Sequence, residues 1–190
     1  YKYLLELLRC GLHEEFFRDA ATMLVPFMDP AVYGRSILEN SSFLASSANP
    51  DPATHGRGFI ARLSGASAEF IHMWLLLTVG QDPFYVQRGE LRFRVRPALP
   101  GWWFTEQPAT IQHDGRRVEI PANSFACTLL GTTLLVYHNA SRGDTFGPAA
   151  LRPVRYALDG RDSFEGACLG TKAATRIRER QCRRLDVWLQ

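Results

Sequence analysis

The order of apolar and polar positions divides this chain into a helical first part and a strand-rich second part. At the start of the chain, apolar side chains recur at helical spacing, which predicts two amphipathic helices, over 1–10 and 13–28. Cys10-Gly11 ends the first helix and Asp29-Pro30 ends the second, because glycine and proline interrupt a helix.

The middle of the chain reads as a long loop followed by the clearest helix. Residues 31–63 keep no regular period, and Asn49-Pro50-Asp51-Pro52 interrupts any regular element. We expect some structure within 37–47, of a type that the pattern does not decide. A helix is predicted over Ser64–Val79, because its first residue is a good N-cap and Gly80 stops it.

After Gly80 the pattern changes to the alternation that is typical of half-buried strands. Short strands with frequent turns predict an antiparallel, jelly-roll-like β-sandwich. We therefore expect a mixed α and β chain, with a helical domain at 1–84 and a sandwich at 85–190. The expected strands and hairpins cover 91–96, 110–120 around Asp114-Gly115, 125–137, 154–158 before Asp159-Gly160, and 184–189.

Composition and charge exclude several classes of protein. The chain has 190 residues, 46% hydrophobic and 22% charged, which is typical of a folded globular protein. A net charge of +3 is too small to indicate nucleic-acid binding, and we expect the Arg176–Arg184 cluster to form a solvated strand face or loop. The longest apolar run, Phe70–Val79, is too short to cross a membrane, and no secretory signal opens the chain, so we expect a cytoplasmic protein.

The cysteines and histidines do not form a metal-binding pattern. Four cysteines without a CxxC pair indicate free thiols rather than disulfides or zinc. Glu69 and His72 stand one helical turn apart, but no third ligand accompanies them, so we expect no metal or other cofactor. The chain opens at Tyr1 inside a helical pattern, without an initiator Met, and we expect it to be a piece of a longer polypeptide.

A cluster of cationic side chains precedes the predicted helix of residues 64–79. His55, Arg57 and Arg62 come shortly before Ser64-Gly65, where unpaired backbone N–H groups and the helix dipole favour an anion. The simpler alternatives are a His55 bonded to a loop carbonyl, a serine that only caps the helix, and arginines that only face solvent. Asp51, between two prolines, favours a turn.

These motifs resemble the end of the catalytic domain in the cellobiose and chitobiose phosphorylases. That family has a His-Gly, a similar gap, and Thr-Gly-Thr-Ala-Ala followed by Trp; here His55-Gly56 precedes Ser64-Gly65-Ala66-Ser67-Ala68 and an aromatic-rich helix. Val95–Trp102 resembles the segment where the family's chain enters its C-terminal sandwich. The order agrees over about residues 14–104, whereas 105–190 match only in their all-β character.

The resemblance implies the last helices of an (α/α)6 toroid followed by the sandwich. It implies an inverting phosphorylase, which cleaves a β-glucoside with inorganic phosphate as co-substrate and releases an α-sugar 1-phosphate. His55, Ser64 and Gly65 would bind the phosphate. A weaker match places Arg35 and Glu39 in the substrate cleft, and Arg62 joins them as a cationic cleft residue.

The chain departs from the family in ways that affect activity. Ser64 replaces a threonine, which keeps the hydroxyl, and 57–63 differs from the usual gap. The family's general acid lies upstream of the matched region, so we expect the chain alone to be inactive and to need the rest of the catalytic domain. The resemblance also favours a homodimer.

Two alternatives remain open. An inverting hydrolase on the same scaffold would place a carboxylate where the phosphate binds. A carbohydrate-binding module without catalysis would fold alone and use aromatic rings such as those of Trp102, Trp103 and Phe104, although adjacent rings at a domain junction more often pack together.

Overall fold

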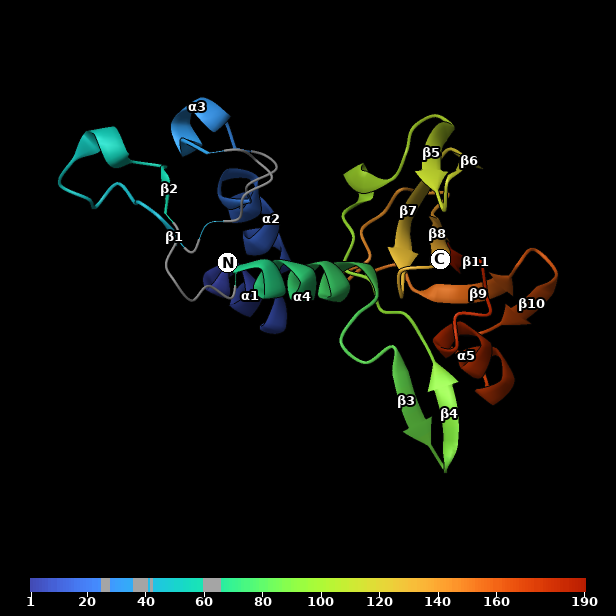
Figure 1. The fold of residues 1–190 in the computed structure, drawn as a ribbon. Coiled ribbons are helices and arrows are strands. Elements are labelled where there is room, and N and C mark those ends of the chain that lie inside the picture. Colours follow the sequence, from blue (N-terminus) through green and yellow to red (C-terminus); the bar gives the residue numbers. More distant parts are fainter. Residues whose placement is uncertain (25–27, 36–40, 42, 60–65) are drawn as a thin grey trace. The chain divides into compact units, whose positions relative to one another are not determined.

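The computed structural model describes residues 1–24, 28–35, 41, 43–59 and 66–190. The chain forms two compact units, Tyr1–Leu76 and Leu77–Gln190 (Figure 1). The division falls inside helix α4 (Ala66–Thr78), earlier than the boundary predicted at 84/85. The last turn of α4 belongs to the second unit because Leu77 O and Val79 O each accept a hydrogen bond of 2.8 Å, from the amides of Ala98 and Arg96.

The first unit begins with the two helices that the sequence predicts. Helix α1 (Lys2–Arg9) buries one side, formed by Leu4, Leu5, Leu7 and Leu8. Helix α2 (His13–Met23) starts where predicted but ends sooner, because Leu24 adopts an extended conformation (ψ 124°).

The segment predicted as a loop contains short regular elements. Asp29 does not simply break the chain: its Oδ1 accepts a hydrogen bond of 2.9 Å from Ala31 N and caps helix α3 (Pro30–Tyr33). Beyond it, β1 (Phe43–Leu44) pairs antiparallel with β2 (Gly58–Phe59), and a 3₁₀ turn, η2 (Pro52–Thr54), lies between them.

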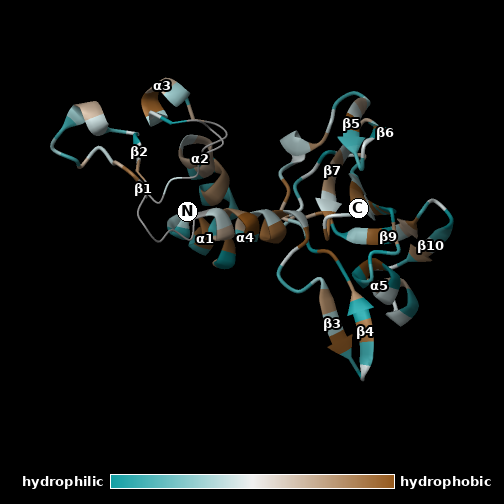
Figure 2. Cartoon of the chain, viewed as in Figure 1, coloured by the Kyte–Doolittle hydropathy of each residue, from teal (hydrophilic) through white to brown (hydrophobic). Residues whose placement is uncertain are grey.

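Helix α4 confirms the predicted helix; the proposed N-cap, Ser64, lies outside the described residues. The helix stops before Gly80, which has a positive φ of 95° and lies against the backbone of Arg96. Figure 2 shows apolar residues along much of α4, and Ile71, Trp74 and Leu75 remain exposed.

The second unit is built on a five-stranded sheet with the order β10-β9-β11-β8-β7. One pairing corrects the antiparallel prediction: β11 runs parallel to β8 and antiparallel to β9. A local pattern predicts a strand but not its direction, which depends on the connections. The strands are β7 (Ser124–Leu129), β8 (Thr133–His138), β9 (Pro153–Leu158), β10 (Asp162–Glu165) and β11 (Arg184–Leu189).

Two further hairpins belong to this unit. The hairpin of β5 (Ala109–His113) and β6 (Arg116–Ile120) confirms the prediction, with Asp114 and Gly115 at φ 50° and 70°. The second hairpin joins β3 (Phe84–Gln87), which was not predicted, to β4 (Glu90–Phe93), which is shorter than expected.

The arginine-rich segment 176–184 is helical only at its start: residues 176–178 end a helix, 179–183 form a loop as predicted, and Arg184 begins β11. Helix α5 (Thr171–Arg178) buries Ala173, Ala174 and Ile177. On its other side, Arg176 forms ion pairs with Asp159 at 3.0 Å and with Asp162 at 2.6 Å. The charge of Arg176 is therefore compensated by the β9–β10 hairpin.

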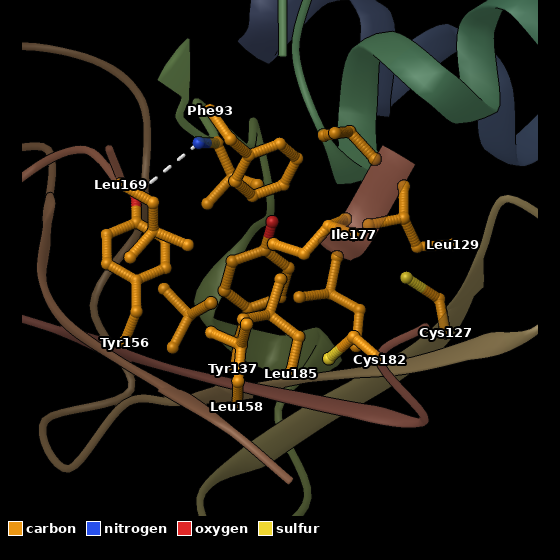
Figure 3. Packing of buried hydrophobic residues seen from close by; sticks show 14 of the residues in the cluster. Phe93, Cys127, Leu129, Tyr137, Tyr156, Leu158, Leu169, Ile177, Cys182 and Leu185 are labelled. Carbon is orange, nitrogen blue, oxygen red and sulfur yellow. Dashed lines mark hydrogen bonds between the residues drawn. The ribbon is translucent and has the colours of Figure 1, made fainter. Parts of the chain in front are cut away.

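One face of the sheet forms the main core (Figure 3). Alternate residues of the central strands point into it, including Leu135, Tyr137, Leu185 and Val187, and α5 contributes Ile177. The hydroxyl of Tyr137 donates a 2.6 Å hydrogen bond to Thr78 O, so the buried phenol has a partner.

The structure thus has mixed α and β architecture, with few helices and mostly antiparallel sheets. Within the described residues, no helix has both the length and the apolar character needed to cross a bilayer.

Candidate functional site

His55 lies at the end of the 3₁₀ turn η2, half-buried, with its Nε2 2.8 Å from the carbonyl oxygen of Asn49. Because a carbonyl only accepts, Nε2 carries the proton and Nδ1 is the lone-pair nitrogen of the neutral ring. The hydrogen bond to a loop carbonyl is the simpler role considered for this residue. The ring can still donate to an anion through Nδ1 once it is doubly protonated.

The loop that holds His55 is fixed by its acidic and amide residues. Asp51 Oδ1 accepts a hydrogen bond of 3.0 Å from Ala53 N, and Asn49 Oδ1 accepts one of 2.9 Å from Asp51 N. Asp51 is therefore a capping residue of the turn, as predicted.

The structure brings Arg35 to the same loop. Its Nε donates a hydrogen bond of 3.0 Å to the carbonyl of Gly58, which starts β2, three positions after His55. Arg57 also lies near this segment, because its Cγ is 3.9 Å from the point where a Cβ on Gly34 would stand. Residues that are far apart in the sequence thus belong to one loop cluster: Arg35, His55 and Arg57.

Sequence reasoning missed the residues that let the segment of Arg35 lie close to the loop of His55. Tyr33 and Ser41 share a hydrogen bond between their hydroxyls, and both pack against Gly58, where a Cβ would overlap them. At Gly56, φ is +78° and a Cβ would lie 2.9 Å from Val32. The two closely spaced glycines were the sequence signal that could have indicated this close backbone packing.

The remaining predicted site residues cannot be placed next to this cluster. Glu39, Arg62, Ser64 and Gly65 lie outside the described residues. Their roles in a phosphate cradle and cleft therefore stay predictions.

The aromatic residues at 102–104 divide between packing and exposure. Phe104 is buried, and Trp103 stacks on Phe125 with ring centroids 5.8 Å apart. Trp102 meets Trp103 edge-on and is 67% exposed. Packing therefore explains two of the three rings, and Trp102 is the most exposed of them.

Glu69 and His72 line a hollow of about 470 Å³ between α1 and α4, together with Lys2, Glu6 and Arg9. Arg9 pairs with Glu6. Across the described part of the chain, no group of three histidine, cysteine or carboxylate side chains is arranged to hold a metal ion.

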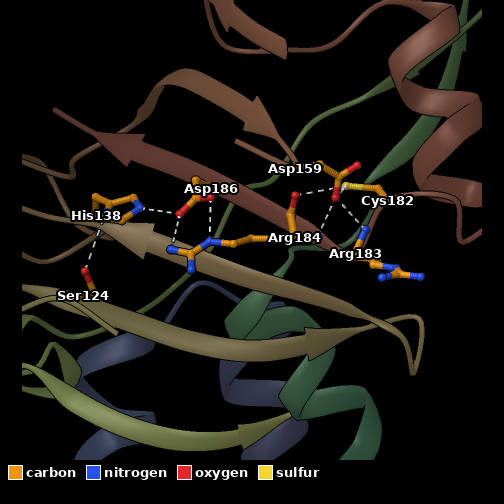
Figure 4. A network of polar contacts seen from close by, with 7 residues as sticks. All are labelled: Ser124, His138, Asp159, Cys182, Arg183, Arg184 and Asp186. Atoms are coloured by element: carbon orange, nitrogen blue, oxygen red, sulfur yellow. Dashed lines mark hydrogen bonds and ion pairs between the residues drawn. The ribbon is translucent and has the colours of Figure 1, made fainter. Parts of the chain in front are cut away.

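A polar network that the sequence did not suggest crosses the second face of the sheet (Figure 4). Ser124 Oγ lies 3.3 Å from His138 Nδ1, and His138 Nε2 lies 2.7 Å from Asp186 Oδ1. The three side chains come from β7, β8 and β11, so only the register of the sheet brings them together. The order of residue types is that of a catalytic serine triad, but the ring nitrogens are exchanged, since in a triad Nε2 faces the serine and Nδ1 the carboxylate.

Burial excludes nucleophilic chemistry at this network. Ser124 is fully buried, so its hydroxyl cannot reach a substrate. Asp186 accepts two hydrogen bonds from Arg184, at 2.8 and 2.9 Å, as well as the one from His138. The His138 ring stacks on Trp188 at 4.7 Å, and Arg155 lies 3.7 Å from the Trp188 centroid. The network therefore links three strands.

The charge of Asp186 depends on these partners. Burial alone raises the pKa of its carboxyl, but hydrogen bonds from His138 and Arg184 outweigh burial, and the pKa lies below its ordinary value. The carboxylate is thus ionised and locally compensated.

A scan against protein-family models finds none that matches this chain, and a search of curated proteins finds no match either. The motif resemblance therefore stands on the residues themselves, and the function remains to be proposed.

Proposed function

We propose that this chain is the C-terminal part of an inverting glycoside phosphorylase, which uses inorganic phosphate to cleave a β-glucoside and release an α-sugar 1-phosphate. The first unit would supply the last helices of an (α/α)6 toroid and its phosphate-binding loop. The second unit would correspond to the attached β-sandwich domain.

The hydrogen bond from Arg35 to Gly58 is the observation that carries this proposal. It attaches an expected cleft residue to the loop of the expected phosphate ligand, His55, although the two are separated by a long stretch of sequence. Phosphate needs positive charge and hydrogen-bond donors; Arg35 and Arg57 would supply both, and His55 would add a donor.

The surface of α4 is a second supporting observation. A helix that is apolar on most sides is typical of one packed among other helices. Ile71 is 59% exposed, Leu75 46% and Trp74 38%. Neighbouring helices of a toroid would cover such a surface.

In the proposed reaction, phosphate attacks the anomeric carbon and the bond to the leaving-group oxygen breaks. His55 would donate to a phosphate oxygen through Nδ1, while its Nε2–H stays on Asn49 O. Ser64 and the Gly65 amide would complete the cradle. The acid that protonates the leaving oxygen would come from outside residues 1–190.

The test uses the complete polypeptide that carries this chain, incubated with short β-glucans with and without inorganic phosphate. Phosphorus NMR reads the sugar 1-phosphate, in the wild type, His55→Ala and Arg161→Ala. The last variant removes an exposed arginine of the β9–β10 turn and serves as the control.

Phosphate-dependent product that collapses in His55→Ala and persists in Arg161→Ala is the expected result. Free sugar formed equally without phosphate would overturn the proposal in favour of the hydrolase. Oligosaccharide binding with no turnover would overturn it in favour of the carbohydrate-binding module.

A further inference from the structure

A cavity of about 450 Å³ in the second unit is lined by three arginines: Arg94, Arg96 and Arg152. They come from the segment after β4 and from the residue before β9. Tyr85 of β3 and Cys168 complete the polar lining, while the exposed Ala167 and the ring of Tyr85 supply apolar surface. A volume of this size is typical of small-molecule sites.

Arg94 is held in place beside an aromatic ring. Its guanidinium carbon lies 4.3 Å from the centroid of Tyr85, a cation–π contact. Its backbone amide donates a hydrogen bond of 2.9 Å to Pro83 O. Its Nε is buried and, within the described chain, has no hydrogen-bond acceptor, so the terminal nitrogens of the guanidinium are the donors that could reach a ligand.

The positive charge of the cavity is not compensated by the protein. Among the described residues, no carboxylate forms an ion pair with Arg94, Arg96 or Arg152. The Nη1 atom of Arg152 donates a hydrogen bond of 3.2 Å to Thr145 O. The exposed Asp82 lines an adjoining hollow of about 80 Å³ that shares Arg94 and Arg96. Three like charges around one cavity repel each other, and a bound anion would relieve this repulsion.

The cavity walls are tied to the core. The hydroxyl of Tyr156 accepts a hydrogen bond of 3.4 Å from Val95 N and donates one of 3.0 Å to Ala167 O. Backbone hydrogen bonds of 2.9 and 3.0 Å join Arg152 to Gln190. The arginines thus project from fixed backbone, which lowers the entropic cost of binding.

We propose that this cavity binds the phosphate group of a small phosphate monoester, with Arg94, Arg96 and Arg152 as its ligands and the organic body against Ala167 and the ring of Tyr85. Guanidinium groups match phosphate oxygens with paired, planar donors. The cavity exceeds what a bare phosphate ion needs, and its apolar walls favour an ester. This site lies in the second unit and does not depend on the role of His55.

Isothermal titration calorimetry on the whole chain tests the site, with glucose 1-phosphate, glycerol 3-phosphate, inorganic phosphate and neutral glucose at constant ionic strength. Arg94→Gln and Arg152→Gln remove one ligand each, and Arg161→Gln removes an exposed arginine outside the cavity. Thermal unfolding verifies that each variant is folded. We expect the esters to bind, glucose not to bind, and each ligand variant to weaken binding about tenfold or more.

A second measurement does not depend on variants. Cys168 lines the cavity and Cys10 is exposed elsewhere, so iodoacetamide labelling read by peptide mass spectrometry compares the two thiols. We expect the esters to slow labelling of Cys168 and not of Cys10.

The outcomes separate this site from the proposed phosphorylase site. Ester binding that His55→Ala leaves intact and Arg94→Gln weakens supports the cavity, whether or not phosphorolysis is found. Inorganic phosphate that binds as tightly as the esters would overturn the assignment of an organic ligand. Ester binding unchanged in both arginine variants, or no binding, would overturn the site.

Discussion

Arg35 Nε donates a hydrogen bond of 3.0 Å to the carbonyl oxygen of Gly58, and this bond connects α3 to the loop of His55. For the proposed phosphorylase, tested in the complete polypeptide, we expect Arg35→Gln to raise the KM for phosphate several-fold with a smaller change in kcat. The free energy of unfolding should change by about 1 kcal/mol, as for one hydrogen bond. Steady-state kinetics at varied phosphate measures this, with Arg161→Gln as the control. Equal falls in kcat and kcat/KM would contradict a positioning role.

Gly58 has no space for a side chain. We expect Gly58→Ala to lower the free energy of unfolding by about 1–3 kcal/mol, because the added methyl group would overlap Tyr33 and Ser41. Denaturant titration measures the loss. Gly170→Ala is the matched control, since its Cβ would meet only Arg92 at an ordinary 3.6 Å. Equal stability of the two variants would show that the packing around Gly58 relaxes freely.

Asp186 should make the second unit sensitive to acid. Its folded-state pKa lies below the ordinary value, so its stabilisation is complete above the unfolded pKa and is lost as the pH falls through the folded pKa. We expect Asp186→Asn to cost about 2 kcal/mol at neutral pH, as for hydrogen bonds to charged groups. The difference from wild type should shrink below about pH 4, near the usual carboxyl pKa. Urea unfolding across pH measures both, and a difference constant down to pH 2 would contradict the ionic role.

The cysteines should differ sharply in reactivity. Burial raises the pKa of Cys127 to about 12 and that of Cys182 to about 11, whereas Cys10 is exposed. Since the thiolate is the reactive form, iodoacetamide at pH 8 should label Cys10 and spare Cys127 and Cys182 until denaturant is added. Labelling of Cys182 in the folded chain would show that the α5 side of the core opens.

Local pattern predicted those elements whose signals are local. The apolar face of α1, the Asp114-Gly115 hairpin and the β11 strand follow from spacing and turn chemistry. Hairpin β3–β4 was missed because its turn uses Arg88-Gly89, with φ of 52° and 78°, instead of the usual Asn or Asp before Gly. Helix α5 was missed because its apolar face consists mainly of alanines, which give a weak periodic signal.

The candidate sites, too, depend on contacts between distant segments that a local pattern does not predict. His55 and Arg35 were selected from motifs, yet the bond that joins them depends on the fit of Tyr33 against Gly58. Arg94 and Arg96 alternate with apolar residues over 91–96, and this pattern alone indicates one solvated face of a strand. Only the fold, which places Arg152 beside them, makes them a cavity.

The place of β11 in the sheet has a consequence for synthesis on the ribosome. The β7–β8 and β9–β10 hairpins are complete before β11 emerges, yet β11 lies between β8 and β9 and supplies the hydrogen bonds to both. Until then, each hairpin exposes a strand edge that invites pairing with another chain. The nascent sheet therefore passes through an aggregation-prone interval that ends only when residues 184–189 leave the exit tunnel.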